Sequence, residues 1–115
     1  MRYCKIRVRR FSNKKLYKKL MRLREFQPPD TRSINVILSE IDRRNPEEFE
    51  AAKIEAEVEK SKRQLVREVD EILYYEIKYC EDYLARPKSE TAPYERKLRA
   101  ANLKMVQKIL ESRRN

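Results

Sequence analysis

The chain of 115 residues contains no glycine. Glycine supplies the positive φ angles of tight hairpin turns and lets the backbone approach phosphate groups closely. Glycine-rich phosphate-binding loops, dinucleotide fingerprints and glycine hairpins are therefore excluded. Charged residues make up 42% of the chain and hydrophobic residues 40%, which is enough apolar surface to fold but too little for a broad globular core. We therefore expect a small protein of elongated shape.

Residues that carry catalysis are also missing. The chain has no histidine, which excludes a histidine base, a histidine metal ligand and a catalytic triad. Its two cysteines, Cys4 and Cys80, are too few for a zinc site or a disulfide framework. Carboxylates alone, spread along exposed helix faces, give no pair of catalytic acid and base. The sequence predicts a binding or scaffolding protein that is not an enzyme and needs no metal or cofactor.

The positive charge is concentrated at the amino-terminal end. Residues 1–24 hold eleven lysines and arginines and no acid, whereas the other ninety-one residues hold 18 basic and 19 acidic residues. Each phosphate that such a block neutralises releases condensed counterions, so RNA is the expected partner, with DNA or an acidic protein as alternatives. The predicted RNA-binding residues are Arg2, Lys5, Arg7, Arg9, Arg10, Lys14, Lys15, Lys18, Lys19, Arg22 and Arg24.

The same basic block bears on localisation. An arginine-rich, acid-free amino terminus that includes Ser12 is typical of a mitochondrial presequence, so we expect the protein in the mitochondrial matrix. Two cysteines without a disulfide framework make a reducing compartment the default. No segment approaches the roughly 18 consecutive apolar residues of a membrane-spanning helix, so no membrane span is expected.

Apolar periodicity separates an amino-terminal arm from helices. Cys4, Ile6 and Val8 alternate with basic residues, which predicts an extended arm. Prolines at Pro87 and Pro93 bound a polar linker near the other end of the chain. The predicted organisation is a basic arm over 1–12, a helical domain over 13–86, and a linker with a carboxy-terminal helix over 87–115.

Two short helices are expected after the arm. Ser12 or Asn13 caps the first helix, which ends before Pro28, and Asp30 caps the second. Each helix carries one apolar stripe at helical spacing. The stripes are Leu16, Leu20 and Leu23 in the first helix and Ile34, Ile37, Leu38 and Ile41 in the second.

The run from Asn45 to Glu48 is the strongest local signal. Asn45 as the N-cap, Pro46 at the first helical position and Glu48 at the third satisfy free amides and complement the helix dipole. No proline or glycine follows before Pro87, so one long helix is expected over about 46–85. A last helix carries a stripe of Tyr94, Leu98, Ala101, Met105 and Ile109. The fold class is therefore all-α, with about four helices.

Tyrosines cluster in the second half of the predicted long helix. Tyr75, Tyr79 and Tyr83 recur at i, i+4 and i+8, with Tyr74 adjacent. Such a row is typical of packing against a neighbouring helix with the hydroxyls toward water, and a partner interface is the alternative. Acidic neighbours such as Glu76 disfavour a base-stacking platform, because they repel phosphate. The three spaced tyrosines are retained as candidate partner-binding residues.

One motif resembles a known family. The run Leu16-Tyr17-Lys18-Lys19-Leu20-Met21-Arg22 resembles the opening of the mitochondrial LYR-motif (complex I LYR-like) family, whose pattern reads roughly Leu-Tyr-Arg-x-Leu-Leu-Arg. Lys18 stands where that pattern has arginine, and the resemblance extends over about residues 13–75. It implies a three-helix core that receives the acyl chain of acyl carrier protein. Leu16, Tyr17 and Leu20 are then candidate partner-binding residues.

Two functions fit these observations. The first is a non-catalytic structural subunit of a large ribonucleoprotein, namely a mitochondrial ribosomal protein. Its basic amino terminus binds rRNA and its helices pack on neighbouring protein subunits. The alternative is an LYR-like subunit or assembly factor of a mitochondrial complex, such as respiratory complex I, that docks acyl carrier protein. Charge segregation and the missing catalytic residues favour the first.

Overall fold

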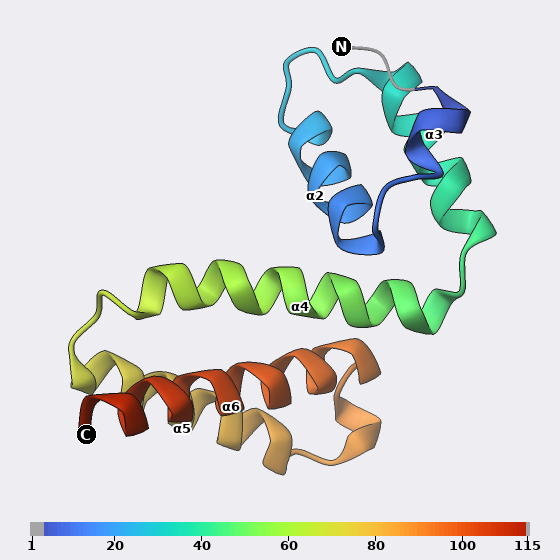
Figure 1. Ribbon diagram of the computed structural model, residues 1–115. Helices are drawn as coiled ribbons and strands as arrows, with labels where there is room; N and C mark the ends of the chain where they lie inside the picture. Colours follow the sequence, from blue (N-terminus) through green and yellow to red (C-terminus); the bar gives the residue numbers. More distant parts are fainter. Residues whose placement is uncertain (1–3, 115) are drawn as a thin grey trace. The chain divides into compact units, whose positions relative to one another are not determined.

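The computed structural model describes residues 4–114, and within that range the chain is all-helical. This confirms the predicted all-α class, although there are six α-helices in the described part where about four were expected. The chain divides into an N-terminal unit, residues 1–56, and a C-terminal unit, residues 57–115 (Figure 1). The helices are α1 (Lys5–Val8), α2 (Asn13–Arg24), α3 (Thr31–Arg43), α4 (Pro46–Leu65), α5 (Asp70–Ala85), the 3-10 helix η1 (Lys88–Glu90) and α6 (Pro93–Arg114).

Three of the helices, α2, α3 and α4, begin at side-chain caps that the sequence predicts. Ser12 Oγ accepts a hydrogen bond from the Lys15 amide at 3.1 Å, and Asp30 Oδ1 accepts one from the Ser33 amide at 3.1 Å. Asn45 Oδ1 accepts from the two amides that follow Pro46, at 2.9 and 3.1 Å. No residue between 4 and 114 has a positive φ angle. The turns of this glycine-free chain are therefore built from right-handed and extended backbone only.

The N-terminal unit is held together by one apolar core to which α1, α2 and α3 contribute. Leu16 of α2 and Ile37 of α3 are fully buried in this core, and both belong to the apolar stripes predicted for these helices. Tyr17 lies edge-on to Phe49 at the start of α4, with ring centroids 6.5 Å apart. The buried members of this core are Val8, Phe11, Leu16, Leu20, Leu23 and Ile37.

The predicted extended arm over residues 1–12 is wrong where the structure describes it. Lys5–Val8 forms one helical turn, and the Val8 amide donates to the Cys4 carbonyl at 3.1 Å. The alternation of apolar residues was a poor guide because Ile6 is 70% exposed, whereas Val8 is buried. Val8 and Phe11, spaced i, i+3, instead enter the core of the unit. Tertiary burial thus decides the conformation of this segment.

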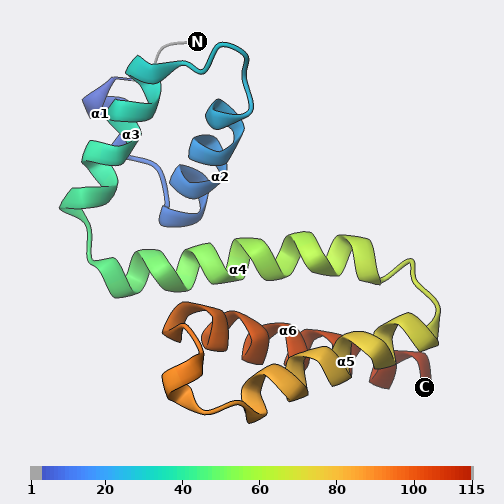
Figure 2. The ribbon, with the colours of Figure 1, turned by 180° about the vertical axis from the view of Figure 1, so that it is seen from behind.

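The C-terminal unit is built on an antiparallel pair of helices, α5 and α6, which run side by side (Figure 2). Leu73 of α5 is fully buried in the core between them. Val58 and Leu65, from the second half of α4, are half-buried against this core. Its buried members are Leu73, Met105, Val106, Ile109 and Leu110.

The single long helix predicted over 46–85 is also wrong, because the chain turns between Leu65 and Asp70. Nothing in the local sequence breaks the helix. The released backbone carbonyls are satisfied from a distant residue: Arg113 donates to the carbonyls of Val66 at 3.1 Å and Glu68 at 2.8 Å. Arg113 also pairs with the carboxylate of Asp70 at 2.6 Å. The turn lets the apolar faces of α4 and α5 share one core with α6.

None of the helices in residues 4–114 combines the length and the apolar character that a membrane crossing needs. The predicted domain boundaries and the elongated shape stay predictions.

The core of the C-terminal unit gives a first prediction. Leu73→Ala leaves a cavity between α5 and α6 and should lower the free energy of unfolding by about 2–5 kcal/mol. The neighbouring Ile72 is 45% exposed, so Ile72→Ala is the matched control and should cost about 0.5 kcal/mol. Urea unfolding followed by circular dichroism measures both. Equal losses for the two variants would contradict the packing face assigned to α5.

Candidate nucleic-acid interface

The basic residues of α2 form an exposed face opposite the apolar core. Lys15, Lys18 and Arg22 are exposed and follow one another at i, i+3 and i+7, so they lie on one side of the helix. Lys14 and Lys19 flank this side and are half-buried. The side chains that point the other way belong to the core of the unit. The sequence-predicted cations of α2 are thus gathered on a folded surface.

Six of the described cations among residues 4–24 have no ion-pair partner in the described part of the chain. The Lys14 ammonium pairs with the Glu55 carboxylate at 3.0 Å. The Lys15 ammonium lies 4.4 Å from the centroid of the Phe11 ring. Arg2 lies outside the described residues. The cations without an ion-pair partner among residues 4–114 are Lys5, Arg9, Arg10, Lys19, Arg22 and Arg24.

Arg44, just after α3, contacts both helices that carry the basic residues, α1 and α2. Its guanidinium pairs with Glu40 Oε2 at 3.2 Å and donates to Asn13 Oδ1, at the start of α2, at 2.9 Å. It also donates to the carbonyls of Val8 at 3.2 Å and Arg9 at 3.3 Å, where α1 ends. One side chain therefore ties α1, the start of α2 and α3 together.

Glu40 is the anionic partner of this arrangement and is only 4% exposed. Arg43 donates to its two oxygens at 3.2 and 3.5 Å, and Arg44 donates to one of them. Burial by itself raises the pKa of the Glu40 carboxyl, but the hydrogen bonds and charges of Arg43 and Arg44 outweigh burial and hold that pKa below its ordinary value. The carboxylate is therefore charged at neutral pH.

Sequence reasoning missed Glu40 and Arg44 as organising residues. A signal was available, because Glu40 falls three residues after Ile37 on the apolar stripe of its helix. An acid on a buried stripe, followed by arginines at i+3 and i+4, indicates a buried ion cluster.

The residues proposed for an LYR-like partner contact lie inside the N-terminal unit. Leu16 is fully buried, and Tyr17 and Leu20 are 6% and 5% exposed. All three side chains are occupied by packing within this chain. Lys18, at the motif's arginine position, is exposed.

The spaced tyrosines lie on a different unit and differ in exposure. Tyr75 is the most exposed, whereas Tyr83 is half-buried beside Arg86. The Tyr79 ring is covered on one face by the Arg99 guanidinium, 4.9 Å from its centroid. Exposed Ile72 continues the row of Tyr75 and Tyr79 along α5. Sequence reasoning singled out only the tyrosines of this helix and so missed this apolar extension.

No protein-family model, curated protein or solved structure matches the chain.

The Glu40 cluster gives a second prediction. A carboxyl whose pKa is lower in the folded than in the unfolded protein adds stability above its ordinary pKa, and this stability is lost as the pH falls through the folded-state value. The native protein should therefore lose stability on acidification more steeply than Glu40→Gln, which is less stable at neutral pH. Thermal melts across the acid range measure this, with Asp42→Asn, an exposed carboxylate of the same helix, as the control. A Glu40→Gln variant with the native acid dependence would contradict the role of Glu40.

Proposed function

We propose that this protein is a non-catalytic structural subunit of a large ribonucleoprotein, a mitochondrial ribosomal protein whose N-terminal unit binds the rRNA backbone. The observation that carries the proposal is the exposed cationic side of α2, made of Lys15, Lys18 and Arg22, on a folded unit whose first 24 residues contain no acid. That unit holds 15 basic and 8 acidic residues, a net charge of +7, against 14 and 11 in the C-terminal unit, a net of +3.

The chemistry of this face suits phosphate better than bases. Lysine and arginine side chains on one side of a helix neutralise phosphates without reading base edges. Because Arg44 ties the end of α1 and the start of α2 to α3, the helices that carry the cations are held in place before RNA arrives. Such preorganisation reduces the ordering cost of binding.

The C-terminal unit supports the second part of the proposal, contact with neighbouring protein subunits. Ile72, Tyr75 and Tyr79 expose apolar and aromatic surface along α5. Tyrosine and other aromatic residues are enriched at protein interfaces. Residues 1–24, rich in arginine and free of acids, support placement in the mitochondrial matrix.

The salt dependence of RNA binding tests the proposal. Affinity for a structured RNA should fall steeply with salt, and replacing Lys15, Lys18 and Arg22 by glutamine should reduce the slope of log K against log salt by about 2. Removing residues 1–12 is a poor test, because Val8 and Phe11 belong to the core. Fluorescence anisotropy at several salt concentrations measures the slope.

The matched control removes the same charge from the C-terminal unit. Lys88, Lys104 and Lys108 are exposed, and their replacement by glutamine should leave the slope nearly unchanged. Equal effects of the two triple variants would show that net charge, and not the α2 face, carries binding. Weak binding at low salt by the native protein would overturn the RNA proposal.

The LYR-like alternative makes a different prediction about Lys18. Lys18→Arg restores the family's arginine, whose planar fork makes bidentate contacts that an ammonium lacks, so capture of acyl carrier protein should increase. RNA affinity should barely change, because one cation replaces another. Pull-down from a mitochondrial extract with the native, Lys18→Arg and Lys18→Glu proteins measures this. Failure of all three to capture acyl carrier protein, with weaker RNA binding by Lys18→Glu, would reject the alternative.

A further inference from the structure

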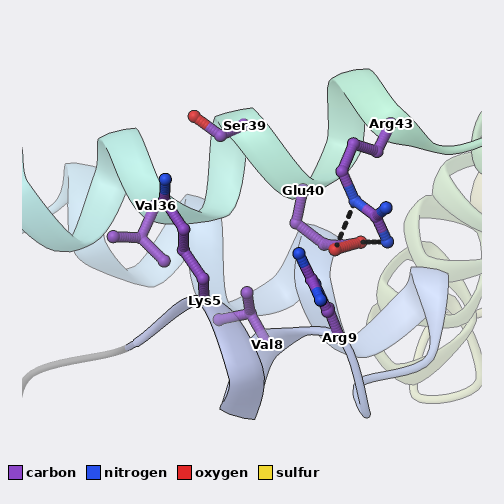
Figure 3. A pocket seen from close by; sticks show the side chains of 7 residues that line it. All are labelled: Lys5, Val8, Arg9, Val36, Ser39, Glu40 and Arg43. Atoms are coloured by element: carbon purple, nitrogen blue, oxygen red, sulfur yellow. Dashed lines mark hydrogen bonds and ion pairs between the residues drawn. The ribbon is translucent and has the colours of Figure 1, made fainter.

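A cavity of about 120 Å³ lies between α1 and α3. Lys5 reaches it from α1, Arg9 from the residue just after α1, and Arg43 from the last residue of α3 (Figure 3). Val8 and Val36 contribute apolar walls. The volume holds several water molecules and so has room for a tetrahedral anion.

The charges around this cavity are unbalanced. Lys5 and Arg9 have no ion-pair partner among residues 4–114. Arg43 uses two of its N–H donors on Glu40, and a guanidinium has five, so three remain for a ligand.

Glu40 does not close the cavity to anions. Its carboxylate lines the cavity, but it accepts hydrogen bonds from Arg43 and from Arg44, which approaches from outside the lining. Three cations and one carboxylate leave a net charge of +2 on the lining. A second acid that would compensate this charge is missing from the lining residues.

We propose that the cavity between α1 and α3 binds a phosphate monoester, such as the 5′-terminal phosphate of an RNA. The RNA source of the phosphate rests on the function proposed above, whereas the cavity chemistry does not. A phosphate monoester carries a charge of about −1.5 to −2 at neutral pH and so matches the +2 of the lining. Its three terminal oxygens suit the several separate donors of Lys5, Arg9 and Arg43.

An end group fits the geometry better than a phosphate inside an RNA strand. A phosphodiester carries a single negative charge and continues as chain on both sides. Beside its charged side chains the lining offers the apolar Val8 and Val36, which cannot hydrogen-bond a continuing sugar backbone (Figure 3). The cavity therefore acts as a binding site for one terminal phosphate.

Two RNAs of the same sequence test the proposal, one with a 5′-phosphate and one with a 5′-hydroxyl. Fluorescence anisotropy at fixed salt should show about tenfold tighter binding of the phosphorylated RNA, which corresponds to about 1.4 kcal/mol. Lys5→Gln and Arg9→Gln should reduce this ratio toward one. Arg10→Gln and Arg22→Gln remove the same charge outside the lining, so they should weaken both RNAs and leave the ratio unchanged.

A second experiment uses inorganic phosphate as the ligand and needs no RNA. Titration followed by amide NMR should shift signals of α1 and α3 in the native protein and fail to do so in Lys5→Gln and Arg9→Gln. If phosphate produces these shifts but the protein binds neither RNA, the cavity is a phosphate site that serves a small phosphorylated molecule. That result would overturn the proposal that the protein binds RNA. Equal affinity for the two RNAs would overturn the proposal that the cavity binds a terminal phosphate, and so would a 5′-phosphate preference that Lys5→Gln and Arg9→Gln leave unchanged. Either result would leave the proposal of RNA binding intact.

Discussion

The partly buried pairing of Arg44 with Glu40 is the interaction on which the basic end of the molecule depends. A helix of one turn has too few hydrogen bonds to persist alone, so α1 needs support from outside itself. Arg44 supplies it by capping the carbonyls of Val8 and Arg9. Glu40 in turn compensates the guanidinium in a place where an unpaired charge is costly. Glu40 therefore acts indirectly: by pairing with Arg44 it stabilises α1 and the basic residues that α1 carries.

The cationic face persists because apolar burial outweighs its repulsion. Like charges at i, i+4 on a helix destabilise it by about 0.2–0.5 kcal/mol per pair, and basic residues in the first turn of α2 oppose the helix dipole by about 0.3–1 kcal/mol each. Burial of each core side chain such as Leu16 or Leu20 contributes about 1.5–3 kcal/mol. A bound polyanion relieves the repulsion between these cations without disturbing the core. Phosphate binding is therefore compatible with the stability of the fold.

The parts of the structure that could be predicted from sequence are those set by local chemistry. Caps at Ser12, Asp30 and Asn45 are short-range hydrogen bonds, and each was visible within a few residues of the helix that it begins. The turn before Asp70 was not visible, because its carbonyls are satisfied by Arg113, more than forty positions away. Likewise the period of two at Cys4–Val8 was overridden by the core against which Val8 packs.

The candidate site divides in the same way. The cations of α2 could be identified because charge and helical spacing are both written in the sequence. The cavity between α1 and α3 could not be identified, since Arg9 and Arg43 line one cavity only once α1 packs on α3. No local sequence pattern encodes the packing of these two helices.

Burial also separates the two functional proposals on energetic grounds. Docking acyl carrier protein through Leu16, Tyr17 and Leu20 requires these side chains to leave a core in which each is at most 6% exposed. Releasing the two leucines alone would cost about 3–6 kcal/mol before any partner contact forms. Phosphate binding uses cations that already face solvent, and therefore requires no such opening. For this reason the ribonucleoprotein proposal makes the smaller demand on the fold, and an LYR-like partner would have to bind tightly enough to compensate the lost core.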